Sequence, residues 1–386
     1  MSASARSASQ RSATPRNLPS LTSLRTFAAL GVFGFHAAGL LAMFGTGHLG
    51  HAAGKAFAGG PTGVSFFFIL SGFVLTWSRR SGVSATRFWR QRAARILPAY
   101  VLAWILGYAV LAGLGHTPPL SGAAASLFLV QVWTSNPDVL FAVNIVAWSL
   151  AVEAVFYLLF PVVLRGLLRL SPRSRPRVMA GLAFVPLTLA LIQHLGHGSG
   201  GYLWLVAYFP LARLPEFLIG ALLALELRDG RWRRIPLLPA AVLALGAYLV
   251  AGQVPQAFMW VCVTLVPYTL LVAAAAQSDL AGSPSWLRER WTVSLGLWSY
   301  AFYLIQVPIG LVVAHYWHPL YRSPVAQVAV FAGYLALVWA AGALVYRFVE
   351  HPLHARFSKP AARPSPEPAH EITLPLATPT FEQATP

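Results

Sequence analysis

The chain is poor in charged side chains and in cysteine. Only 10% of its 386 residues are Asp, Glu, Lys or Arg, whereas 57% are hydrophobic, and the mean hydropathy is +0.62. A soluble globular protein carries about 25% charged residues, so this composition indicates an integral membrane protein. The single cysteine, Cys262, excludes a disulfide framework within the chain and a site built from several thiolates. The histidines lack the spacing of a metal site, and we expect no metal.

Acidic residues are scarcer than basic ones. The chain has 11 Asp and Glu against 28 Lys and Arg, which gives a net charge of +17. In a soluble protein this excess suggests nucleic acid, but here the arginines cluster in short loops between apolar runs. That pattern is typical of topology signals in membrane proteins. We therefore expect a lipid bilayer, and no nucleic acid, as the partner of the basic residues.

Ten apolar runs are long enough to cross the ~30 Å hydrocarbon core of a bilayer. They lie at about residues 21–44, 61–78, 96–114, 146–164, 178–194, 203–225, 236–252, 257–276, 293–314 and 324–346. We interpret the first run as a retained span rather than a cleaved signal peptide, because it is long and contains Arg25 and His36. The sequence predicts an all-α, multi-pass protein of the plasma membrane with about ten transmembrane helices.

The distribution of arginine predicts how these helices are oriented. An eleventh apolar segment at 121–133 is short, and if it does not cross, the main basic loops and both termini lie on one face. Those loops are Arg79 to Arg95, Arg165 to Arg177, Arg228 to Arg234 and Arg288 to Arg290. The positive-inside bias then places both termini in the cytoplasm and makes 121–133 a re-entrant or surface stretch. We expect disordered tails at 1–20 and at the Pro-rich 354–386, flanking one membrane domain at 21–353.

Few ionisable side chains fall within the predicted spans. Each costs on the order of 3 kcal/mol on insertion scales, so those present are functional candidates. Arg25 and His36 are three helical turns apart, which aligns them with ~16 Å of axial rise. This spacing predicts a basic group at the cytoplasmic mouth and an imidazole near mid-depth, suited to an elongated anionic ligand. The structural alternative for His36 is a packing histidine.

Glu153 lies about 10 Å inside the fourth run by helical rise. Ser149 and Tyr157 share its face at four-residue spacing. The alternative for Glu153 is a carboxyl bonded to neighbouring helices. Arg213 and Glu216 are three residues apart, and for them we favour a structural ion pair along one helix.

For two further groups of polar residues, the sequence allows either a structural or a functional role. Ser299, Tyr303 and Gln306 form an uncharged stripe that either lines a substrate passage or bonds between helices. The expected cytoplasmic loop from Arg79 to Arg95 either anchors the topology or binds phosphate, for which forked guanidinium groups are suited.

Seven motifs in order resemble the membrane-bound acyltransferase 3 family over about residues 20–353. They are "LTSLRTFAALGVFGFH", "GPTGVSFFFILSGFVL", "FWRQRAARILPAY", "WSLAVEAVFYLLFP", "RLPEFLIGALLA", "LGLWSYAFYLIQVP" and "RFVEHP". The resemblance implies ten spans and transfer of acyl groups, often acetyl, from acyl-CoA to hydroxyls of sugars, lipids or natural products. The sequence looks most like members of the family that acylate macrolides and similar secondary metabolites.

By position, Arg25 and His36 match the arginine and histidine pair on the first helix of the family, where the histidine is usually catalytic. Arg92 and Arg95 match its paired arginines, and Glu153 matches the acid of its Trp-Ser-Leu motif.

Two further motifs match without a clear catalytic role. Ser71 and Gly72 match the Ser-Gly-Phe motif of the family, and the structural alternative to a functional role for this motif is close helix packing. Glu350 matches a terminal Glu-x-Pro element of the family.

The sequence also departs from the family pattern. Many members carry Asp where Ser65 stands and His where Gln306 stands, which leaves His36 as the one imidazole well inside a predicted span. The tail lacks the hydrolase-like domain of some sugar-modifying members, so we expect a stand-alone form.

These matches lead to one mechanistic hypothesis. Acyl-CoA enters from the cytosol with its phosphates on Arg25, Arg92 and Arg95, and neutral His36 accepts the proton of the acceptor hydroxyl. Glu153 orients the imidazole or steadies its positive charge.

The remaining candidates contact substrate. Ser149, Tyr157 or a backbone amide supplies the oxyanion donor, and Tyr303 and Gln306 line the substrate passage. Direct attack is favoured because Cys262 has no basic neighbour in its span, and an acyl-histidine intermediate is the alternative.

The main alternative is a proton-coupled transporter or flippase of a polar or acylated small molecule. In that case His36, Glu153 and Glu216 form a proton relay, and flux occurs without thioester consumption.

Overall fold

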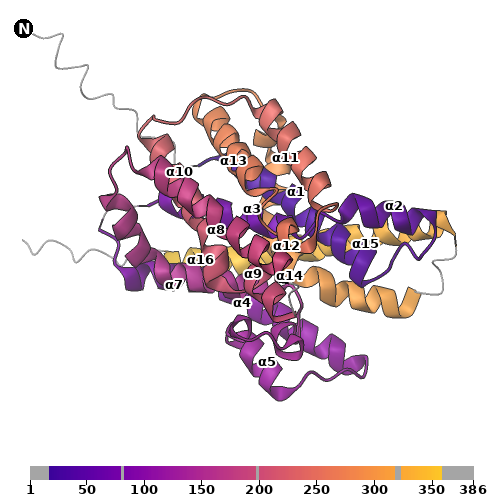
Figure 1. Ribbon diagram of the computed structural model, residues 1–386. Helices are drawn as coiled ribbons and strands as arrows, with labels where there is room; N and C mark the ends of the chain where they lie inside the picture. The colour runs from indigo at the N-terminus through magenta and orange to yellow at the C-terminus, as the bar shows by residue number, and fades with distance from the viewer. Residues whose placement is uncertain (1–16, 80–81, 197–199, 318–322, 359–386) are drawn as a thin grey trace, which may run out of the picture.

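The protein folds as a helical bundle in a computed structural model that describes residues 17–79, 82–196, 200–317 and 323–358 (Figure 1). Within these residues every regular element is a helix. The predicted tails at 1–20 and 354–386 lie mostly outside the described residues. Of their described parts, residues 19–20 begin helix α1 and residues 354–358 end helix α16.

The first half of the chain supplies α1 to α7, with two short helical turns. These elements are α1 (Pro19–Phe35) with the π turn η1 (His36–Leu40), α2 (His48–Phe57), α3 (Thr62–Trp77), α4 (Ala85–Gly113), α5 (Leu120–Leu127), the 3₁₀ turn η2 (Gln131–Trp133), α6 (Pro137–Leu140) and α7 (Ala147–Arg169).

The second half supplies α8 to α16. They are α8 (Arg175–Leu195), α9 (Gly200–Ala207), α10 (Pro210–Arg228), α11 (Leu237–Ala251), α12 (Gln256–Met259), α13 (Leu265–Leu280), η3 (Trp286–Arg288), α14 (Arg290–Trp317), α15 (Pro324–Val345), the π turn η5 (Tyr346–Glu350) and α16 (His351–Ser358).

Helix length and hydropathy make this a multi-pass membrane protein. In the described part of the chain, seven helices are long and apolar enough to cross a bilayer, and α11 and α13 are shorter apolar helices. The helical membrane fold is thus confirmed, while ten as the number of spans stays a prediction. Helix α5 has 8 residues and is about 12 Å long, too short to cross, which agrees with a stretch at 121–133 that does not span.

Helix α4 begins eleven residues before the predicted span. Ser84 caps it by accepting a hydrogen bond from the backbone N–H of Arg87 at 3.3 Å. The expected loop over 79–95 is therefore wrong beyond Ser84. Because Arg92 and Arg95 are three residues apart on a helix, they point to the same side.

Two predicted spans are interrupted. The run 203–225 is divided into α9 and α10, because Pro210 at the first position of α10 cannot donate a backbone hydrogen bond to α9. The run 257–276 begins as the single turn α12 and continues as α13. Both breaks occur inside continuous apolar sequence.

Helices α3 and α10 cross with their backbones in contact. A Cβ atom on Gly72 would lie 1.9 Å from the carbonyl oxygen of Phe217, and one on Gly220 would lie 1.9 Å from that of Ile69. Small residues permit this approach in membrane bundles. Gly72 therefore has a packing role, which was the structural alternative for the Ser-Gly-Phe motif.

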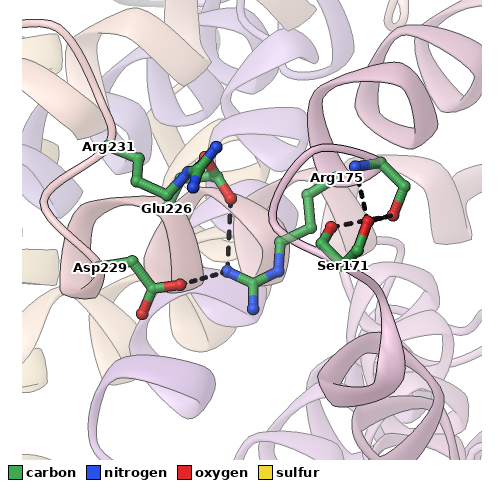
Figure 2. A network of polar contacts seen from close by, with 6 residues as sticks. Ser171, Arg175, Glu226, Asp229 and Arg231 are labelled. Atoms are coloured by element: carbon green, nitrogen blue, oxygen red, sulfur yellow. Dashed lines mark hydrogen bonds and ion pairs between the residues drawn. The ribbon is translucent and has the colours of Figure 1, made fainter.

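Polar contacts join several helix ends at one end of the bundle. Figure 2 shows Arg175, at the start of α8, donating to Glu226 at 3.3 Å and to Asp229 at 2.5 Å, both near the end of α10. At the start of α1, Ser20 donates its backbone N–H and hydroxyl to the Asp279 carboxylate of α13 at 2.9 and 2.6 Å. The starts of α1 and α8 thus lie beside the ends of α13 and α10.

Candidate active site

A cavity of about 970 Å³, counting its open part, lies between α1, α3, α4, α7 and α14. Its lining combines cationic, hydroxyl and apolar side chains from segments far apart in the sequence. The polar lining residues are Arg25, Ser71, Arg92, Arg95, Ser149, Glu153, Tyr157, Ser299, Tyr300 and Tyr303. Seven of the nine predicted site residues are among them, and His36 and Gln306 are not.

Three arginines from two helices meet at this cavity. Arg25 comes from α1, and Arg92 and Arg95 come from α4. Among the described residues none of the three forms an ion pair or a side-chain hydrogen bond, and the buried Nε of Arg92 has no hydrogen-bond partner. Arg25 and Arg95 are close enough for their charges to repel each other. An anion between them relieves this repulsion and fills the free donors.

Glu153 is the centre of a hydrogen-bonded cluster in the same cavity. Ser71 of α3 donates to Glu153 Oε1 at 2.7 Å, and Tyr157 donates to the same oxygen. The two hydroxyls lie 3.0 Å apart. Sequence reasoning missed the polar role of Ser71, because its motif was interpreted as a packing element. The signal that identifies it is the Ser71–Glu153 contact between α3 and α7.

A second hydroxyl pair lines the cavity between α7 and α14. The hydroxyls of Ser149 and Tyr303 lie 2.7 Å apart, and Ser149 also donates to the Val146 carbonyl at 3.0 Å. Ser299, one turn before Tyr303, uses its hydroxyl on the Gly296 carbonyl at 2.7 Å. Ser299 and Tyr303 of the predicted polar stripe therefore both line the cavity, and the Ser299 hydroxyl also bonds within its own helix.

His36 lies outside the lining of this cavity. It is 8% exposed and begins the π turn at the end of α1, so it stands at the end of the regular helix and not near its middle. Its ring lies within interaction range of the side chain of Gln306, which is buried one turn beyond Tyr303. Within the described residues, neither Nδ1 of His36 nor Oε1 of Gln306 has a hydrogen-bond partner.

The expected contact between Glu153 and His36 is not formed. In the part of the chain that the structure describes, no hydrogen bond or ion pair joins the two side chains, and the partners of Glu153 are Ser71 and Tyr157. Cys262 is a half-buried free thiol, and the described residues hold no group of three or more His, Cys, Asp or Glu side chains suited to a metal.

The predicted pairing of Arg213 with Glu216 is confirmed. Arg213 donates from Nε to Glu216 Oε2 at 2.6 Å and from Nη2 to Oε1 at 3.2 Å. It also donates to the Ala207 carbonyl at 2.6 Å and to Ser65 Oγ at 3.0 Å. Ser65, at the position where Asp is common in the family that the sequence resembles, thus accepts a hydrogen bond from this arginine.

Taken together, the cavity combines cationic groups that form no ion pair among the described residues with hydrogen-bonded hydroxyl and carboxyl groups, inside an apolar helical bundle. That combination suits an enzyme that holds an anionic donor and transfers a group to a hydroxyl. Comparison with known proteins agrees. A family model described as "Acyltransferase domain" matches residues 18–346, and the chain belongs to this family, acyltransferase 3, and is an acyltransferase.

Curated relatives extend over most of the chain. Acyltransferase MdmB of Streptomyces mycarofaciens is 35% identical over 358 residues, which cover 87% of this chain and 91% of MdmB. O-acetyltransferase OatA of Staphylococcus aureus and the putative peptidoglycan O-acetyltransferase YrhL of Bacillus subtilis are each 26% identical and match 89% and 88% of this chain. The chain spans 58% of OatA and 55% of YrhL. No solved structure matches.

Proposed function

We propose that this protein is a membrane O-acyltransferase that uses acyl-CoA as donor. It moves an acetyl or other short acyl group to a hydroxyl of a sugar, a glycan or a secondary metabolite such as a macrolide. The observation that carries the proposal is the cavity in which Arg25, Arg92 and Arg95 lie without paired carboxylates. The names of OatA and YrhL, both O-acetyltransferases, support a hydroxyl acceptor.

The three arginines bind the phosphates of the donor in this proposal. Arg92 and Arg95 extend from one helical face, and Arg25 approaches from α1, so a diphosphate has guanidinium groups on two sides. Charge-assisted hydrogen bonds from arginine to phosphate are stronger than neutral ones, and the fork of the guanidinium matches phosphate geometry. The apolar lining, which includes Phe67 and Leu304, then surrounds the less polar arm of the donor.

Transfer forms one bond and breaks another. The acceptor oxygen attacks the thioester carbon, the carbon–sulfur bond breaks, and the hydroxyl proton finally protonates the sulfur of the departing thiol. His36 is the proposed base. His36 does not line the cavity, and in this proposal the turn of α14 with Tyr303 and Gln306 shifts to admit it.

The hydroxyl groups have separate roles in this scheme. Ser71 and Tyr157 direct their protons at Glu153, so they hold the carboxylate. The Ser149–Tyr303 pair is the proposed donor to the oxyanion that forms on the thioester, for which a proton now directed at the Val146 carbonyl turns to the oxyanion.

We also propose ten crossings of the plasma membrane with both termini in the cytoplasm. The contacts of Ser20 with Asp279 and of Arg175 with Asp229 support a common face for the starts of α1 and α8 and the ends of α13 and α10. Arg228 at the end of α10 donates to the Thr76 carbonyl at the end of α3 at 3.4 Å. The proposed topology places most of the loop arginines on this face, which agrees with the positive-inside bias.

Purified protein tests the reaction directly. Radiolabelled acetyl-CoA and longer acyl-CoAs are incubated with sugar and macrolide acceptors, and free thiol and labelled product are measured. We expect thiol release that depends on the acceptor. Arg92→Gln should raise the KM for acetyl-CoA about tenfold, whereas Arg90→Gln, an exposed arginine on the same helix outside the cavity, should not.

Two outcomes oppose the proposal. Equal KM values for the Arg92 and Arg90 variants contradict the phosphate contact. Proton-coupled flux of a small molecule without thioester consumption supports the transporter instead. For that alternative Glu216 is a poor relay member, because both of its carboxylate oxygens accept hydrogen bonds from Arg213.

A further inference from the structure

Glu350 ends the π turn that follows α15 and lies near the arginines of the cavity. Its side chain is 8% exposed and interacts electrostatically with Arg25 and Arg95. The π turn and α16 pack against α4, the helix that carries Arg92 and Arg95. Oε1 of Glu350 has no hydrogen-bond partner among the described residues. A buried carboxylate therefore lies within electrostatic range of two guanidinium groups and forms an ion pair with neither.

The absence of a direct ion pair between Glu350 and these two arginines distinguishes it from a buried carboxylate with a purely structural role. Within the described residues, Glu350 forms no ion pair closer than the 4.0 Å that defines one, although its charge acts on both arginines. A carboxylate buried for stability alone gains most from direct contact, because desolvation is otherwise uncompensated. The π turn is a further irregularity, since single π turns within α-helices occur often at functional sites.

We propose that Glu350 is the counter-charge that balances Arg25 and Arg95 before the donor arrives, and that it competes with the donor phosphates for them. The inference rests on the proposed function, since it names phosphate as the competitor. In the free protein the carboxylate offsets the repulsion between the two guanidinium groups. When a phosphate bridges them, the carboxylate is excess negative charge. Glu350 is thus a positioning residue that weakens donor binding and favours release of the spent donor.

The test compares Glu350→Gln with Glu289→Gln, a matched loss of one negative charge at an exposed position. Two donors are used: acetyl-CoA, and S-acetylpantetheine, which lacks phosphate. We expect Glu350→Gln to lower the KM for acetyl-CoA about threefold to tenfold without raising kcat. The KM for S-acetylpantetheine should not change. Pyrophosphate should inhibit this variant at correspondingly lower concentration, and Glu289→Gln should behave as the wild type.

Several results overturn the inference. An unchanged or higher KM for acetyl-CoA contradicts competition, and an equal shift for both donors shows an effect unrelated to phosphate. Wild-type protein that releases no thiol refutes the proposed function, while the stabilisation of each variant by pyrophosphate, measured as the shift in thermal midpoint, still tests Glu350. If Glu350→Gln does not fold, the double variant with Arg95→Gln restores the charge balance. Folding of that double variant supports the inference, and its failure indicates a packing role.

Discussion

The buried pair of Arg213 and Glu216 makes a quantitative prediction. Arg213 is 0% exposed and satisfies both carboxylate oxygens of Glu216, the Ala207 carbonyl and the Ser65 hydroxyl. Its guanidinium also lies over the Phe68 ring, 5.1 Å from the centroid. Arg213→Met keeps a long flexible side chain but removes every one of these donors. Glu216 is then a charged carboxylate without a partner in the apolar bundle.

The expected loss of stability depends on whether one partner of the buried ion pair is removed or both are replaced. Removing one partner of a buried ion pair costs about 3–5 kcal/mol, whereas replacing both with apolar side chains is often neutral. We expect Arg213→Met to lower the free energy of unfolding by about 3–5 kcal/mol and Glu216→Leu by a similar amount. The double variant should lose only about 1–2 kcal/mol, since the Ala207 carbonyl is left without its donor. The coupling energy is thus several kcal/mol in favour of the double variant.

Equilibrium unfolding in detergent measures these values, with Arg90→Met as the exposed control. Thiol release from acetyl-CoA by the folded double variant measures its activity. We expect activity close to that of the wild type, because neither residue lines the cavity. A double variant as unstable as Arg213→Met refutes the reasoning about charge. A stable but inactive double variant refutes the structural role and favours the proton relay.

Three further predictions concern packing and chemistry. Gly72→Ala should cost about 1–3 kcal/mol by forcing α3 away from α10, whereas Gly181→Ala, with open space around it, should be neutral in a thermal unfolding scan. Tyr157→Phe should lower kcat about tenfold by freeing one side of Glu153, with about 1 kcal/mol lost from stability; equal kinetics would contradict this. His36→Ala should abolish transfer while CoA still raises the thermal midpoint, and retained turnover would refute its role as base.

Hydropathy predicts helices well here but not where they begin or break. The apolar run at 96–114 locates α4, yet the helix starts at Ala85 because Ser84 caps it, and a hydropathy run contains no capping signal. Pro210 divides a continuous apolar run for the same reason, since backbone hydrogen bonding and not hydrophobicity ends a helix. His36 falls in the middle of its run but at the end of its α-helix, where the π turn begins.

In the candidate site, the spacing of residues along the sequence predicts which side chains lie on the same side of a helix. It does not predict which neighbouring helix packs against that side. The alignment of Ser149, Glu153 and Tyr157 on one side of α7 follows from their four-residue spacing. The contact of Glu153 with Ser71 does not, because it depends on how α3 and α7 are placed. The partner of Glu153 expected from the sequence, His36, forms no hydrogen bond or ion pair with it among the described residues, and the role of Glu153 beside His36 stays a prediction.

The opposite ends of the amino-acid sequence meet at the arginine cluster. Arg25 belongs to the first helix and Glu350 to the segment after α15, so their interaction spans almost the whole domain. During translation, Arg25 is made long before Glu350, the carboxylate that we propose balances it. Glu153 of α7, which also interacts electrostatically with Arg25, is made earlier, and Glu350 adds its charge only once the segment after α15 has been made. This makes completion of the chain, rather than any local step, the event that completes the site.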